Sequence, residues 1–440
     1  MAGTSPAMTT KELQSGCMTA FILPLCDPAA TKPERVGAKA ANLAALAQAG
    51  LPTPGGFCID ADAYHRQVDH LGIADAVRAY ADADQPTQRR LSVEIRLALY
   101  QGDVAPDLLA DILAAWRAER KPVAVRSSSL VEDRAETSFA GQFESFLGVT
   151  GESEFLIALR ACWAALWTTN ARRHMTQHGL DPSETAMAVL VQPLIAARVS
   201  GGGMSETADG QMMLSATWGL GSAIAQGEIV PDRIVLSRQG FVRTNEAGCK
   251  HHRETCLHGA GTTAQPVPDD LALTPCLEAG QATALGRLMR KAEGILGMPV
   301  EIEWALDEEG FKLLQARPLT IAPAHVPDEI WLKHPALNGH PAGIGWGSGR
   351  AVVVNCECEL SRVGPGDILV TRVAGPALSH ILPRVGGVVA ELGGSTSHLA
   401  SLARERGIPM VLGVNEATRR IPDGAQVAVD GVAGVVRWLA

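Results

Sequence analysis

The sequence lacks the features that mark several large classes of protein. Its 440 residues carry a net charge of −9, and no block of Lys or Arg forms a basic stripe, so neither nucleic acid nor an anionic membrane is an expected partner. The apolar run from Ala20 to Leu25 is shorter than a signal-peptide core or a membrane span. There is no internal repeat and no low-complexity tract. The length instead predicts two or three globular domains.

The cysteines lack a repeating spacing. There are nine of them, and an odd, scattered set favours reduced thiols in the cytoplasm over a disulfide framework. Cys356 and Cys358 alternate along an expected strand, where we predict packing roles. Five side chains of the kind that bind zinc crowd together: Cys249, His251, His252, Cys256 and His258. Their irregular spacing favours a solvated loop, with a metal site as the alternative.

Strand and helix signals alternate through most of the chain, which predicts an α/β and α+β multidomain protein. Residues 1–18 are expected to form a flexible tail before a first domain, residues 19–320. Residues 321–342 are expected to be a linker, because their first part carries two prolines and no periodicity. Residues 343–440 carry short Val-rich runs broken by Gly, which predicts a small compact domain.

One histidine of the last domain stands at a place suited to an anion. The segment from Glu391 to His398 is typical of a strand, a glycine turn and the start of a helix, which we expect to run from Ser397 to Arg406. Free backbone N–H groups and the helix dipole there favour negative charge and disfavour a protonated imidazole. A neutral imidazole is a competent nucleophile toward phosphorus. The alternative is a histidine that only packs or caps the helix.

Two cations of the first domain lie where phosphate oxygens could meet them. Lys39 begins an Ala-rich and Leu-rich helix that ends at Gly50, and a cation there opposes the helix dipole unless an anion lies beside it. Arg126 and three serines end an apolar strand, residues 122–129, and supply donors for phosphate. Taken singly, each cation could equally be a solvated surface residue or part of an ordinary ion pair.

Two short strands, residues 300–306 and 311–317, predict a β-hairpin. Gly310 in the third loop position suits a type I turn closed by a glycine bulge. That register pairs two sets of polar side chains: Glu303 with Gln315, and Glu301 with Arg317. Alternation then puts four apolar side chains on the other face: Ile302, Trp304, Leu314 and Ala316. A carboxylate beside an amide oxygen can hold Mg²⁺; a solvent-facing hairpin with one exposed salt bridge is the alternative.

These segments together resemble a known family. Residues 391–409 resemble the phosphohistidine signature of the swivelling domain of phosphoenolpyruvate-utilising enzymes, with Thr396-Ser397-His398 intact. Residues 364–370 and 422–431 resemble strands of the same domain. Residues 34–320 resemble the ATP-grasp domain, composed of two subdomains, that precedes it in phosphoenolpyruvate synthase and pyruvate phosphate dikinase. The resemblance covers nearly the whole chain.

The resemblance implies roles for individual residues, with ATP and Mg²⁺ as cofactors. The catalytic segment would be Thr396, Ser397 and His398. The nucleotide would be bound by Lys39, Arg126 and Arg317 at its phosphates and by Gln192 at the adenine, and the metal by Glu303 and Gln315. Two departures put a nucleotide contact in doubt: Ser222 stands where relatives usually have an acidic residue after Gly-Leu-Gly, and residues 200–206 replace a more apolar run.

The family's chemistry implies a double displacement in which His398 takes a pyrophosphoryl group from ATP, releases AMP, and passes phosphate onward. Relatives continue into an acceptor-binding barrel or insert a drug-binding domain, and neither is expected here. We therefore expect a small-molecule acceptor or, preferably, an acceptor on a separate subunit. An ATP-grasp ligase that yields ADP and a non-catalytic phosphocarrier remain as alternatives.

Overall fold

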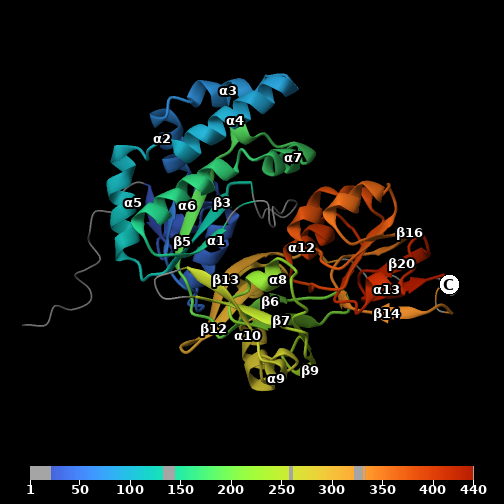
Figure 1. Cartoon of the computed structure of the whole chain (residues 1–440). Coiled ribbons are helices and arrows are strands. Elements are labelled where there is room, and N and C mark those ends of the chain that lie inside the picture. The colour runs from blue at the N-terminus through green and yellow to red at the C-terminus, as the bar shows by residue number, and fades with distance from the viewer. Residues whose placement is uncertain are drawn as a thin grey trace, which may run out of the picture.

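The structure, a computed structural model, describes residues 21–131, 143, 145–256, 261–321, 331 and 333–439. These residues form three larger sheets, a two-stranded ribbon and surrounding helices, so the predicted mixed architecture is confirmed. Figure 1 shows the three parts side by side, with α12 on the side of the C-terminal part that is turned toward the other two. No helix in the described part of the chain combines the length and apolar character needed to cross a bilayer. The predicted tail, residues 1–18, lies outside the described residues.

The first sheet is antiparallel and has the order β1-β2-β5-β3-β4. Its strands are β1 (Ile22–Pro24), β2 (Phe57–Ile59), β3 (Val123–Ser129), β4 (Ser145–Val149) and β5 (Met187–Pro193). Its helices are α1 (Pro33–Gln48), α2 (Ala61–His70), α3 (Ala74–Ala81), α4 (Gln85–Gln101), α5 (Pro106–Ala118), α6 (Glu152–Ala165) and α7 (Thr169–Gln177). Leu190 packs toward α1, whereas Val189 and Val191 pack toward the other helices. Because both faces are covered, β5 is apolar without alternation.

The second sheet is also antiparallel, with the order β13-β12-β6-β7-β8-β9. Its strands are β6 (Val199–Met204), β7 (Met212–Trp218), β8 (Asp232–Leu236), β9 (Val242–Glu246), β12 (Val300–Asp307) and β13 (Gly310–Pro318). The accompanying helices are α8 (Ser222–Ala225), α9 (Asp269–Ala272) and α10 (Ala279–Leu296). Leu285 and Met289 of α10 pack on one face, against Leu214 and Ile302. The opposite face of the sheet is therefore not covered by α10.

A two-stranded ribbon of β10 (His252–Cys256) and β11 (Thr262–Pro266) contacts this second part. It includes part of the segment with zinc-type side chains, so residues 252–256 are a strand and not the expected loop. No cluster of three or more metal-binding side chains occurs among the described residues. His258 lies outside them.

The third sheet has the order β14-β21-β20-β16-β17-β18-β19-β15, with β16 to β19 parallel. Its strands are β14 (Ala336–Asn338), β15 (His340–Pro341), β16 (Trp346–Val354), β17 (Ile368–Thr371), β18 (Gly387–Ala390), β19 (Met410–Leu412), β20 (Gln426–Asp430) and β21 (Val435–Trp438). Helix α12 (His398–Glu405) follows β18, and α13 (Ala417–Arg420) follows β19. Separate apolar clusters fill the two faces of the sheet.

Two predictions about this last part were wrong. Residues 321–342 are not all linker, because residues 336–341 pair with β21 and β19; the third part therefore begins by Ala336. Cys356 and Cys358 do not pack in the core and are not thiols, since both are exposed and joined in a disulfide. The physical reason is that β16 ends at Val354 and the chain turns into a 3-10 helix (Glu357–Arg362), so the strand alternation stops before the pair.

Candidate active site

A cavity of about 370 Å³ lies where the three parts of the molecule meet. It is bordered by β3, by the hairpin β12–β13, by β6, and by the loop before α12. Its lining includes eight of the side chains predicted from the sequence: Lys39, Arg126, Gln192, Glu303, Gln315, Arg317, Thr396 and His398. Ser397 is the one predicted site residue that is absent from this lining.

Lys39 reaches the cavity because α1 is interrupted. Gly37 has φ 75° and ψ 157°, which breaks the helix and lets its regular part begin near Lys39. A Cβ on Gly37 would lie 2.6 Å from the backbone oxygen of Ser128, so the helix can approach β3 this closely only with glycine. Lys39 is 8% exposed and donates to the Ser127 carbonyl at 3.0 Å. The cation predicted at a helix start is thus aimed at the cavity.

Arg126 and Glu303 face each other across the cavity wall. Arg126 Nη1 lies 3.4 Å from Glu303 Oε2. Desolvation raises the pKa of Glu303, but its charged surroundings, foremost the guanidinium of Arg126, outweigh this effect and hold the pKa below its usual value. The carboxylate is therefore ionised at neutral pH. It is still partly open to the cavity, with 39% of its side chain exposed.

The hairpin has the predicted pairing of polar residues, but its loop differs from the predicted one. Glu303 pairs with Gln315 and Glu301 with Arg317. However, Asp307 pairs with Gly310, so the loop has two residues and not three. The register is restored by a β-bulge opposite Trp304, which leaves Leu314 as the extra residue.

The bulge corrects one predicted side-chain position. Leu314 was expected on the apolar face, but it lines the cavity together with Gln315. Leu313 takes the place in the core instead and is fully buried. Because a bulge interrupts the alternation of side chains, two consecutive residues can point to the same face.

His398 begins α12, as predicted, and borders the cavity. Desolvation lowers the pKa of His398; Glu303 opposes this, and Arg317 and Lys39 lower it further, so the net pKa is below its usual value. The imidazole is therefore neutral at neutral pH. Ser397 is buried and caps the helix, its Oγ accepting from the Ala400 N–H at 3.3 Å.

Several buried polar atoms around the cavity have no hydrogen-bond partner among the described residues. They are Gln192 Nε2, Arg126 Nε and Thr396 Oγ1. Orphaned buried donors are costly, so a native site that contains several is built to receive acceptor oxygens or nitrogens. Phosphate oxygens and an adenine ring supply these acceptors. The donor set thus fits a nucleotide.

Two stretches of the chain match known families. Residues 33–331 match the family model described as pyruvate phosphate dikinase, AMP/ATP-binding domain. Residues 363–434 match the one described as PEP-utilising enzyme, mobile domain. The chain belongs to the phosphoenolpyruvate synthase and pyruvate phosphate dikinase family. The description of the first model names an AMP/ATP-binding domain, so the match supports binding of an adenine nucleotide by residues 33–331.

Curated relatives extend well beyond the part that this family member matches. A phosphoenolpyruvate synthase of Pyrococcus furiosus is 31% identical, with 91% of this chain and 56% of the relative covered. A probable phosphoenolpyruvate synthase of Methanothermobacter thermautotrophicus is 31% identical, over 91% of this chain and 61% of the relative. The phosphoenolpyruvate synthase of Escherichia coli is 30% identical, over 91% and 55%. The chain thus spans little more than half the length of these relatives.

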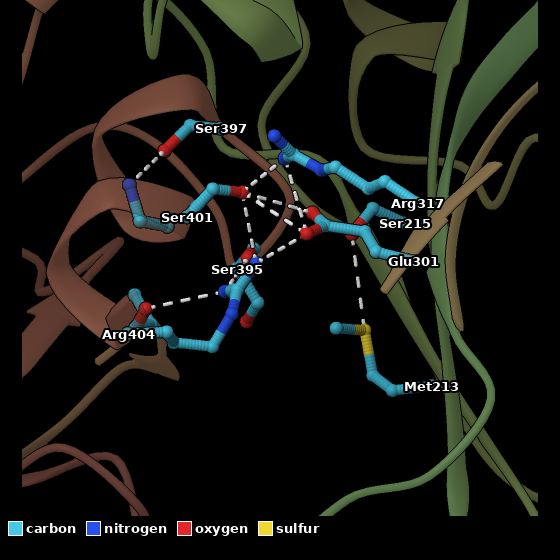
Figure 2. Close-up of polar contacts among 10 residues, drawn as sticks. Met213, Ser215, Glu301, Arg317, Ser395, Ser397, Ser401 and Arg404 are labelled. Atoms are coloured by element: carbon cyan, nitrogen blue, oxygen red, sulfur yellow. Dashed lines mark hydrogen bonds and ion pairs between the residues drawn. The ribbon is translucent and has the colours of Figure 1, made fainter. Parts of the chain in front are cut away.

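The structure adds three residues to the site of this dikinase-family chain that sequence reasoning did not assign to it. Glu301 was predicted only as a partner of Arg317, and Arg404 lies within the expected helix, residues 397–406, without an assigned role. Figure 2 shows that both belong to one buried polar group with Ser401, at the contact between β12 and α12. Two signals were available in the sequence. Alternation along the strand puts Glu301 on the same face as Glu303, and Ser401 follows His398 by three residues, as Arg404 follows Ser401.

The two departures from the family pattern both lie at this site. Ser222 lines the cavity, and its hydroxyl donates to the carboxylate of Glu254 on β10. An acidic group is thus held beside position 222 by a neighbouring strand. In the glycine run, Gly202 packs against the Thr396 side chain of the C-terminal part. Both positions therefore contribute to the shape of the cavity.

Proposed function

We propose that this chain is a dikinase-type phosphotransferase in which His398 is phosphorylated by ATP bound in the cavity. The observation that carries the proposal is the meeting of a neutral, largely desolvated imidazole with three cations and a Glu–Gln pair on one cavity. A nucleophile needs the neutral form, and a polyphosphate needs the cations. The unpaired Gln192 Nε2 and Thr396 Oγ1 can donate to acceptor atoms of adenine and phosphate.

In the first step, the cations bind phosphate and His398 is the nucleophile. Arg126, Arg317 and Lys39 bind phosphate oxygens and disperse the charge that develops on them. An imidazole nitrogen of His398 forms a bond to the β-phosphorus, and the bond from that phosphorus to the oxygen bridging the α-phosphate breaks. AMP leaves with that oxygen. The terminal phosphate is then transferred to water or inorganic phosphate, and the remaining phosphoryl group goes from His398 to the acceptor.

Glu303 and Gln315 are the residues that would hold Mg²⁺. Their carboxylate and amide oxygens are hard ligands, they are paired across the β12–β13 ladder, and both line the cavity. A bound Mg²⁺ would neutralise phosphate charge. The remaining ligands would have to come from phosphate oxygens and water, since no third acidic or histidine ligand is grouped with this pair in the described residues.

The acceptor is either a small molecule or bound by a separate subunit. Four cysteines of the described residues that form no disulfide support the cytoplasm as the location: Cys26, Cys58, Cys249 and Cys276. The exposed disulfide between Cys356 and Cys358 is the exception.

Transfer of labelled phosphate from ATP to the protein tests the proposal. The purified chain is incubated with ATP labelled at the β- or γ-phosphate, and the nucleotide product and the protein are examined. We expect AMP, and label on the protein that is labile in acid and stable in alkali. His398→Ala should abolish the labelling, whereas His380→Ala, an exposed histidine of the same domain, should not. ADP as the only product, or label that survives His398→Ala, would contradict the proposal.

A further inference from the structure

A buried carboxylate joins the second part of the molecule to the third. Glu301 on β12 is 6% exposed. Its carboxylate lies 3.1 Å from Arg317 Nη2 and 2.8 Å from Arg404 Nη2. Ser401 Oγ lies 3.1 Å from each of its oxygens. Figure 2 shows these groups converging from β12–β13 on one side and from α12 on the other.

The contacts of Glu301 with Ser401 and Arg404 form only when the two parts are together. Desolvation raises the pKa of Glu301, but Arg317 and Arg404 outweigh it and hold the pKa below its usual value, so the carboxylate is ionised. A buried charge that loses its partner is strongly unfavourable. Separation of the parts would return Glu301 and Arg404 to water without their mutual contact. The group therefore acts on docking and not on the fold of either part.

Contacts within the third part hold Arg404 in position. Arg404 also donates to the carbonyls of Ser395 and Ala342, both in its own domain. Its guanidinium is thus held in place before any contact with Glu301. His398, Ser401 and Arg404 follow one another at three-residue spacing on α12, so they lie along one side of the helix. Fixing Ser401 and Arg404 fixes the direction in which His398 points.

Arg317 links this contact to the cavity. It lines the cavity, and its guanidinium donates to Ser401 Oγ as well as pairing with Glu301. Nearby, Gly202 lies so close to Thr396 that a Cβ there would be 2.6 Å from the Thr396 Cβ. Residues on both sides of His398 in the sequence, Thr396 and Ser401, therefore lie against the second part of the molecule.

We propose that Glu301, Ser401 and Arg404 are positioning residues that form a docking latch, which holds the C-terminal part with His398 directed into the nucleotide cavity. The inference rests on the proposed function of His398. The latch touches neither ATP nor the reacting atoms through Ser401 or Arg404. It raises the rate of phosphorylation by raising the fraction of molecules in the docked arrangement.

Ser401→Ala tests the latch with the least damage to either part. It deletes the hydroxyl that contacts Glu301 and Arg317 and keeps a good helix residue. Hydrogen bonds to charged groups are strong enough for us to expect an approximately tenfold lower rate of phosphohistidine formation, with KM for ATP unchanged. Glu301→Gln keeps the shape and removes the charge, and we expect a larger loss. Ser361→Ala, an exposed serine of the same domain, is the matched control.

Docking is measured separately by hydrogen–deuterium exchange. Backbone amides of α12 and β6 should exchange faster in Ser401→Ala and Glu301→Gln than in the unaltered chain and in Ser361→Ala. If the unaltered chain is phosphorylated and both variants match it in rate and in exchange, the latch is refuted while the proposed function stands. If the unaltered chain is never phosphorylated, the proposed function fails; faster exchange in the variants would then still support the docking contact, and unchanged exchange would refute it.

Discussion

At the scale of the residue, the chemistry depends on keeping one imidazole neutral. Burial would achieve this alone, but it would also isolate His398 from a charged substrate. The cavity resolves the conflict with cations, because Arg317 and Lys39 lower the pKa of His398 further while offering charge to phosphate. Glu303 opposes them, and the lower pKa is the net result.

This balance predicts how phosphorylation depends on pH. The pKa of His398 is below its ordinary value of 6.5 in the folded chain, so the neutral form persists as the pH falls through 6.5. The rate of phosphohistidine formation should therefore still exceed half of its maximum at pH 6.5 and fall to half only in more acid solution. Initial rates measured from neutral to mildly acid pH provide the check, with circular dichroism to confirm folding. A midpoint at or above 6.5 would contradict the assigned environment.

Single residues were also where sequence reasoning was most and least successful. The position of His398, Lys39 and Arg126 at one cavity was predictable, because each stands at the start of a helix or in a strand that ends in polar residues. Ser397 was assigned with the catalytic segment from its position in the motif. Its hydroxyl caps α12, a role that serine favours at the position before a helix.

At the scale of the element, the β12–β13 hairpin determines which side chains line the cavity in which we propose that the nucleotide binds. Alternation and one glycine were enough to predict that Glu303 faces Gln315. The β-bulge was not predictable, since two leucines in succession fit either a regular ladder or a bulged one. The structure decides between them by burying Leu313 and leaving Leu314 at the cavity.

The two adjacent leucines should therefore respond differently to the same substitution. Leu313→Ala removes a fully buried side chain from the core, and we expect it to lower the free energy of unfolding by about 2–5 kcal/mol. Leu314→Ala should cost much less stability and should instead raise KM for ATP, because it removes part of the cavity wall. Urea unfolding and steady-state kinetics on the two variants check this. The reverse pattern would mean that the ladder is regular.

At the scale of the whole molecule, function depends on how closely the third part approaches the other two. Contacts come from both: Arg406 donates to Nδ1 of His174 on α7 at 3.1 Å, and the Gly393 N–H donates to the Ile229 carbonyl at 3.0 Å. None of these pairs could be predicted from the sequence, because their members lie far apart in the chain and no local pattern relates them. The family resemblance implied that His398 must reach the nucleotide, but not which residues permit it.

Gly202 tests this approach directly. It lies in β6 with an ordinary strand conformation, so alanine fits the backbone, but its Cβ would lie 2.6 Å from the Thr396 Cβ. Relief requires the third part to move away, because the short Thr396 side chain has no flexible end to shift. Overpacking of this kind is unfavourable enough for us to expect that Gly202→Ala lowers phosphorylation of His398 by about tenfold or more.

The same substitution should leave the separate parts folded, so the loss must come with a change in shape. Small-angle X-ray scattering should show a larger radius of gyration for Gly202→Ala than for the unaltered chain, at an unchanged melting temperature. Gly280→Ala, on α10 with open space around the new Cβ, is the matched control and should alter neither. If Gly202→Ala is phosphorylated at the normal rate with a normal radius, the third part does not need this close approach for His398 to react, and the docked arrangement is not the reactive one.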